Sequence, residues 1–153
     1  MIETIKFTIP LFDASVTRSR ANPKKIYCVD HGLVPSIASG ILLNSGHLLE
    51  NLVFSALRRL SGRIFYGRTK GGHEVDFVVP QQDRSALLIQ VSESLVDPKS
   101  RNREVASLSE AMAEMGVASG MIVTRVEEAE IKTESGIIKV VPIWRFLLDM
   151  TGS

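Results

Sequence analysis

Apolar and polar residues follow one another in patterns that predict helices, strands and short turns. Between residues 47 and 60 the apolar residues recur at helical spacing and form one stripe, which predicts an amphipathic helix ending near Gly62. Three strands are expected next, at 63–66, 73–79 and 86–92, because short apolar runs are separated by turn residues. Asp97-Pro98 then predicts the start of a second helix, which we expect to run to Met115 and stop at Gly116.

Further elements are expected on both sides of this core. Upstream we predict a strand within residues 1–12, a loop over 13–23, a strand at 25–29 and a helix at 34–43. Downstream we predict a strand at 120–124, a hairpin at 130–141 that turns at Ser135-Gly136, and a short final helix after Pro142.

The order of these elements predicts one α/β domain with a mixed central sheet flanked by helices. We assign residues 1–43 to an N-terminal extension, 44–125 to the core, and 126–153 to a C-terminal hairpin and helix. The first three core strands have short connections and should pair antiparallel, whereas the strand after the second helix should lie parallel to a neighbour. Strict alternation in the second core strand puts its residues on two faces: Val75, Phe77 and Val79 on one, and Glu74, Asp76 and Val78 on the other.

The composition is ordinary for a soluble globular protein. The 153 residues are 44% hydrophobic and 23% charged, and the single Cys28 can form no internal disulfide. No signal peptide is visible, and no apolar run approaches the ~20 residues that cross a bilayer. We therefore expect a cytoplasmic location and no membrane partner.

Charge is distributed unevenly although the net charge is only +1. One stretch carries five basic residues and no acid, and it predicts a nucleic-acid-binding surface: Arg58, Arg59, Arg63, Arg68 and Lys70. A solvated surface without a ligand is the alternative for each of these residues.

Polar residues inside apolar elements mark a candidate site. Asp76 lies in an apolar strand, Glu50 lies at the edge of the apolar stripe of the first helix, and Gln90 and Ser92 lie in the next strand. Burying an acid is costly unless it has a partner, a metal or a catalytic role. The alternatives are a pairing of Asp76 with Arg63, Arg68 or a backbone donor, a helix-surface role for Glu50, and a polar pair that only fills a cleft.

These four residues, on this order of elements, resemble the restriction-endonuclease-like (PD-(D/E)xK) superfamily. The resemblance implies a restriction-endonuclease-like core in which Glu50, Asp76, Gln90 and Ser92 occupy the catalytic positions. Glu50 and Asp76 would then hold Mg²⁺ or Mn²⁺, which lowers the pKa of a bound water and neutralises charge on the scissile phosphate.

A second resemblance covers nearly the whole chain. The phrases NPKKIYCVDHGLV, GHLLENLVFSALRR, GGHEVDFVV and IQVSESLVDPKSRNRE resemble a prokaryotic domain of unknown function. That domain forms the C-terminal part of AAA-type P-loop ATPases and is assigned to the same superfamily. A P-loop ATPase module is therefore an expected partner, while this chain contains no G-x-x-x-x-G-K-[ST] motif with which to bind ATP itself.

The match to the superfamily departs at two positions. Gln90 stands in place of an acid and Ser92 in place of a lysine, so the site loses a negative ligand and a cation. Lys99 or Arg103, near the start of the next helix, could bring a charge into the cleft. We expect Arg103-Glu104 to form an ion pair at the helix end or to support the cleft.

Three functions remain open on the sequence. The first is a nucleic-acid-binding or regulatory module of an ATPase, with DNA as partner and a degenerate active site. The second is an active Mg²⁺-dependent nuclease that uses Glu50, Asp76 and a base from elsewhere. The third is a protein-interaction domain whose apolar ends pack on an ATPase module or on another copy of the chain.

Overall fold

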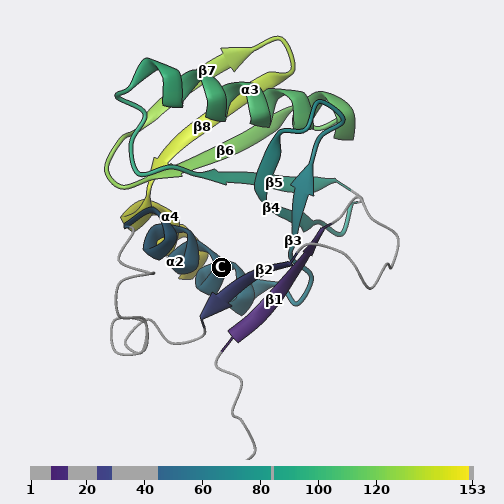
Figure 1. Cartoon of the computed structure of the whole chain (residues 1–153), viewed down its shortest axis with the longest axis vertical. Coiled ribbons are helices and arrows are strands. Elements are labelled where there is room, and N and C mark those ends of the chain that lie inside the picture. Colours follow the sequence, from purple (N-terminus) through teal and green to yellow (C-terminus); the bar gives the residue numbers. More distant parts are fainter. Residues whose placement is uncertain (1–7, 14–23, 29–44, 84, 152–153) are drawn as a thin grey trace, which may run out of the picture.

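The computed structural model describes residues 8–13, 24–28, 45–83 and 85–151 (Figure 1). Their helices and strands, in chain order, are β1 (Thr8–Asp13), β2 (Lys24–Cys28), α2 (Ser45–Leu60), β3 (Phe65–Arg68), β4 (Glu74–Pro80), β5 (Ala86–Val91), α3 (Pro98–Met115), β6 (Ser119–Thr124), β7 (Ala129–Thr133), β8 (Gly136–Pro142) and α4 (Ile143–Thr151). The predicted helix at 34–43, and most of the predicted loop at 13–23, lie outside the described residues.

All eight described strands form one mixed sheet in the order β2-β1-β3-β4-β5-β6-β8-β7. The strands β3, β4 and β5 pair antiparallel, and β6 pairs parallel with β5, as the connections predict. The predicted hairpin is confirmed as β7 and β8, but β8 also pairs parallel with β6 and thereby leaves β7 at the edge. At the other end β1 pairs parallel with β3, so strands from the N-terminal region extend the same sheet.

Helices cover both faces of the sheet (Figure 1). The helix α3 packs on one face, where Leu108 and Met112 are fully buried against β5, β6 and β8. The helices α2 and α4 pack together on the other face, where Phe54 and Phe146 join the same buried cluster. Because β5 lies between these layers, its neighbouring residues Leu88 and Ile89 are both inaccessible to solvent although they point to opposite faces.

The ends of α3 follow the sequence signals. The Asp97 carboxylate accepts a hydrogen bond of 2.8 Å from the backbone N–H of Ser100, and Pro98 occupies the first turn. Gly116 closes the helix in the left-handed conformation, with φ of 65°. The predicted boundaries of this helix are therefore confirmed.

The alternation of β4 is interrupted beside Asp76. The pairing of β3 with β4 shifts by one residue there, since Phe65 lies opposite Val78 whereas Gly67 lies opposite Val75. This extra residue is a β-bulge, which reverses the alternation of side chains along the strand. Val75 and Val78 consequently belong to the same buried cluster on the α3 face, and the prediction that they lie on opposite faces is wrong.

None of the helices in the described ranges has the length and apolar character needed to cross a membrane.

Candidate functional site

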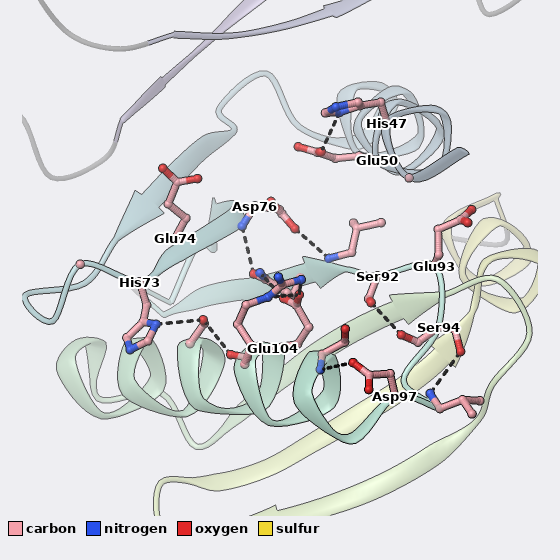
Figure 2. A pocket seen from close by; sticks show the side chains of 18 residues that line it. His47, Glu50, His73, Glu74, Asp76, Ser92, Glu93, Ser94, Asp97 and Glu104 are labelled. Atoms are coloured by element: carbon pink, nitrogen blue, oxygen red, sulfur yellow. Dashed lines mark hydrogen bonds and ion pairs between the residues drawn. The ribbon is translucent and has the colours of Figure 1, made fainter. Parts of the chain in front are cut away.

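A cavity of about 890 Å³ opens between α2, the start of β4, the end of β5, the loop after β5, and the first half of α3 (Figure 2). The four residues predicted from the sequence, Glu50, Asp76, Gln90 and Ser92, all line it. Three different elements and one loop therefore bring together side chains that are far apart in the chain. Figure 2 shows Glu50 on the α2 side of the cavity and Asp76 on β4, which faces it.

Asp76 connects β4 to β5 through its side chain at the point where the regular pairing stops. Its Oδ2 accepts a hydrogen bond of 2.9 Å from the backbone N–H of Val91, and its own N–H donates to Oε1 of Gln90 at 3.2 Å. The pairing with a backbone donor, one of the alternatives drawn from the sequence, is thus present. The regular pairing of β4 with β5 ends at Phe77 and Ile89, and these side-chain hydrogen bonds continue the connection between the two strands beyond that point.

Gln90 links this strand pair to α3. Its Nε2 donates to Oε2 of Glu104 at 2.6 Å, and Glu104 is only 5% exposed. The other carboxylate oxygen, Oε1, accepts from Nε and Nη2 of Arg103 at 3.1 and 2.7 Å. Glu104 therefore carries a buried charge that is compensated by one amide and one guanidinium. The interaction raises the pKa of Arg103, because the hydrogen bond to Glu104 and its negative charge both favour the protonated guanidinium.

Ser92 contributes no charge. Its hydroxyl donates to the backbone carbonyl of Ser94 at 3.1 Å and so helps to shape the loop that follows β5. The same loop is held from the far side by Glu127, whose Oε1 accepts from the Ser94 hydroxyl at 2.5 Å and from the Leu95 N–H at 2.9 Å. Burial alone would raise the pKa of Glu127, but these hydrogen bonds outweigh it and lower the pKa below its ordinary value.

Tyr27 on β2 holds Glu50, and sequence reasoning missed this residue. Its ring is 5% exposed and stacks on Phe54 with centroids 4.2 Å apart. Its hydroxyl donates to Oε1 of Glu50 at 2.6 Å. Burial and the adjacent carboxylate raise the pKa of Tyr27 far above its ordinary value, so it donates as a neutral phenol. An aromatic residue in a short apolar strand reads as core, and nothing local indicates its partner.

Replacing Tyr27 by Phe should lower the stability of the folded chain by about 1 kcal/mol, because a carboxylate then loses one hydrogen bond in a partly buried setting. Urea unfolding of the full chain measures this loss. A double-mutant cycle with Glu50→Ala separates the hydrogen bond from changes in packing. An unchanged unfolding midpoint in Tyr27→Phe would contradict the structural role of the bond.

The basic stretch does not line the cavity. Arg58, Arg59, Arg63, Arg68 and Lys70 are all exposed, at the end of α2 and around β3 and its turn, and none is among the lining residues. The guanidinium of Arg68 pairs with Glu74 at 2.5 Å, and Nη1 of Arg58 donates to the carbonyl of Gly62 at 2.8 Å. Of the two cations proposed to reach the cleft, Lys99 is outside the lining and Arg103 is in it.

The cavity is rich in acids. Its lining carries six carboxylates, those of Glu50, Glu74, Asp76, Glu93, Asp97 and Glu104. Among the lining residues that the structure describes, Arg103 is the only Lys or Arg, and the remaining titratable side chains are His47 and His73. Such a lining repels a bare phosphate and attracts cations.

The donors present suit a hard divalent cation. Within the described part of the chain, no three Asp, Glu, His or Cys side chains gather closely enough to hold a metal ion alone. Mg²⁺, however, commonly uses one or two carboxylates and completes its shell with water and phosphate oxygens. Glu50 and Asp76 line the cavity and would be the two carboxylates of such a site, with water or phosphate oxygens as the remaining ligands.

A Ser–His–Glu arrangement also borders the cavity. The Ser107 hydroxyl lies 3.4 Å from Nδ1 of His73, and Nε2 of His73 lies 3.6 Å from Glu110. The serine, however, is 4% exposed and donates its proton to the backbone carbonyl of Arg103 at 2.9 Å. A nucleophile needs access to substrate and a proton directed at its base, so this trio is structural.

Comparison with known families gives one match. The model described as Domain of unknown function (DUF4143) matches residues 45–146, which span α2 to α4 and include every residue of the cavity. No curated protein and no solved structure gives a significant match to the chain.

Proposed function

We propose that this chain, which belongs to the family of domains of unknown function DUF4143, is a nuclease-like module that binds nucleic acid in the acidic cavity and has a degenerate active site. The observation that carries the proposal is the meeting of Glu50 and Asp76 in one cavity beside Gln90-Val91-Ser92. The resemblance of the sequence to the C-terminal domain of AAA-type ATPases adds that the module works in, or beside, such an ATPase.

The cavity supports binding more than cleavage. Gln90 donates its amide to Glu104 and accepts from the backbone of Asp76, and Ser92 bonds to its own loop, so neither supplies an acid or a cation. The carboxylates of Glu50 and Asp76 each accept a hydrogen bond from the protein. Efficient hydrolysis requires a strongly activated water and a neutralised phosphate. This set of donors activates water and neutralises phosphate less than a site with an acid at position 90 and a lysine at position 92 would.

A phosphate group can enter so acidic a cavity only when a cation balances the negative charges of the phosphate and of the lining carboxylates. A divalent cation held by Glu50 and Asp76 would provide that balance and would bridge the protein to phosphate oxygens. Nucleic acid should therefore bind to this module with a requirement for Mg²⁺ or Mn²⁺, and not through an extended basic surface.

Fluorescence anisotropy with labelled single-stranded and duplex oligonucleotides tests the proposal. We expect binding in Mg²⁺ that weakens by roughly tenfold or more in EDTA or in Asp76→Asn, since the variant keeps an acceptor for the Val91 N–H but loses the charge that holds the cation. Glu130→Gln, which removes an exposed acid on β7 away from the cavity, is the matched control.

Two results are informative beyond affinity. Absence of binding to both oligonucleotides in Mg²⁺ and Mn²⁺ would overturn the proposal. Cleavage of supercoiled DNA that disappears in Asp76→Asn would replace it with an active nuclease, the second function indicated by the sequence.

A further inference from the structure

The guanidinium of Arg103 is the one strong cation at this cavity within the part of the chain that the structure describes. The side chain is 69% exposed, while its partner Glu104 is almost completely buried. The guanidinium of Arg103 thus faces solvent at the mouth of the cavity, while its hydrogen bonds to the buried Glu104 hold it in place. An exposed arginine on a helix surface can ordinarily adopt many side-chain conformations. The pairing with a buried carboxylate restricts the conformations of Arg103.

A series of hydrogen bonds through three residues connects Arg103 to the strands β4 and β5. Nε and Nη2 of Arg103 donate to Glu104, Glu104 accepts from Gln90, and Gln90 accepts from the backbone N–H of Asp76. Figure 2 shows the two labelled members of this series, Glu104 on α3 and Asp76 on β4. Because Glu104 and Gln90 are both buried, packing as well as hydrogen bonds fixes the positions of these two side chains.

We propose that Arg103 is the residue of the cavity that contacts a phosphate group, and that Gln90 positions it through Glu104. The inference rests on the proposed function, which supplies the phosphodiester, and it names the side chain that receives it. On this view the cation missing from β5 at Ser92 is supplied by α3.

The chemistry of the guanidinium fits that role. It has five N–H donors, and the two hydrogen bonds to Glu104 use two of them. Donors on the remaining edges can bind a phosphate oxygen while the Glu104 pair stays intact, and planar forks of this kind match phosphate oxygens well. A lysine at this position would keep the charge but lose the fork that Glu104 holds.

Two variants of α3 test the contact. Arg103→Gln should weaken binding of a duplex oligonucleotide in Mg²⁺ by roughly tenfold and reduce the slope of log K against log salt by about 1, since one phosphate contact is lost. Arg101→Gln removes the same charge from the exposed surface of the same helix but lies outside the cavity lining, so both quantities should remain those of the wild type. Arg103→Lys should recover part of the slope and less of the affinity.

The positioning role of Gln90 has its own readout. Gln90→Met removes the amide that donates to Glu104 without adding a carboxylate beside Asp76, and it should lower oligonucleotide affinity about as far as Arg103→Gln does. The exchanged double variant Gln90→Glu with Glu104→Gln keeps an amide–carboxylate pair between the two positions and should bind more tightly than Gln90→Met. Equal affinity of these two variants, with both proteins folded by circular dichroism, would overturn the positioning role.

A titration with inorganic phosphate separates the inference from the proposed function. In Mg²⁺, at ionic strength matched with chloride, phosphate should shift the Arg103 Nε–H resonance of the full chain in an NMR spectrum and leave that of Arg101 in place. A chain that binds phosphate in this way but no oligonucleotide would overturn the proposed function alone. An oligonucleotide bound equally well by wild type and Arg103→Gln, or no response to either probe, would overturn the assignment of Arg103.

Discussion

Replacing Gly136 by Ala should destabilise the folded chain by more than about 3 kcal/mol, a loss that only severe local conflicts produce. Gly136 begins β8 with φ of 139°, a backbone conformation that side chains with a Cβ rarely adopt. A Cβ built there would lie 2.0 Å from the carbonyl oxygen of Ala118. The same carbonyl accepts the N–H of Ile137 at 3.0 Å, where the parallel pairing of β8 with β6 begins, so it cannot move away without loss of that pairing.

Gly72→Ala separates the two causes of this loss. Gly72 also has a positive φ, 87°, but nothing lies within 4 Å of a Cβ at that position. Its replacement should therefore cost only the backbone term, about 1–2 kcal/mol. Urea unfolding of both full-length variants gives the comparison, and equal losses would show that the contact with Ala118 has no role.

Local signals were sufficient to predict the elements around the site. The apolar stripe of α2, the Asp97-Pro98 start of α3 and the Gly116 stop each depend on residues within a few positions of one another. The antiparallel order of β3, β4 and β5 follows from short connections, and the parallel pairing of β6 follows from the helix before it.

Pairings between distant segments were beyond such signals. The predicted hairpin gave no indication that β8 would enter the sheet beside β6 while β7 stayed at the edge. The bulge beside Asp76 likewise lies in the pairing of β4 with β3, and no residue pattern within β4 alone indicates it. Strict alternation within β4 therefore assigned Val78 and Val75 to opposite faces, although they share one.

The site was predictable as a set of positions but not as a set of contacts. Polar residues in apolar elements marked Glu50, Asp76 and Gln90, and the structure gathers all three around one cavity. Their partners gave weaker signals, because Tyr27 has the pattern of an ordinary core aromatic and Glu104 that of a helix-surface acid beside Arg103. Only the approach of α3 to the end of β5 makes Glu104 buried and brings it to Gln90.

Replacing Gln90 by Glu should destabilise the chain by about 2–4 kcal/mol at neutral pH, because a second buried carboxylate would then face Glu104 without a donor between them. The wild-type contact is 2.6 Å long, with both side chains less than 10% exposed. Such a pair can avoid two adjacent negative charges only by taking up one proton, which raises the pKa of the pair above the value of about 4.3 for an unfolded glutamate.

The sign of the pH dependence follows from that shift. A carboxyl pair whose folded pKa is raised binds more protons in the folded state than in the unfolded state between the two values. The variant should therefore approach wild-type stability near pH 4, where the two glutamates of the unfolded chain are also largely protonated. It should lose stability as the pH rises through the raised folded pKa. Urea unfolding at several pH values between 4 and 8 measures the difference from wild type, and a difference independent of pH would contradict the mechanism.

The exchanged double variant, Gln90→Glu with Glu104→Gln, distinguishes charge repulsion from a defect in shape. Its amide at 104 can donate to the new carboxylate at 90, which can also accept the N–H of Asp76, and its carbonyl oxygen can accept from Arg103 as Glu104 does in the wild type. Stability should return to within about 1 kcal/mol of wild type, with the pH dependence removed. Recovery would show that positions 90 and 104 can exchange acid and amide without loss of the contact between β5 and α3. A double variant as unstable as Gln90→Glu would instead show that the cavity tolerates an acid on α3 only.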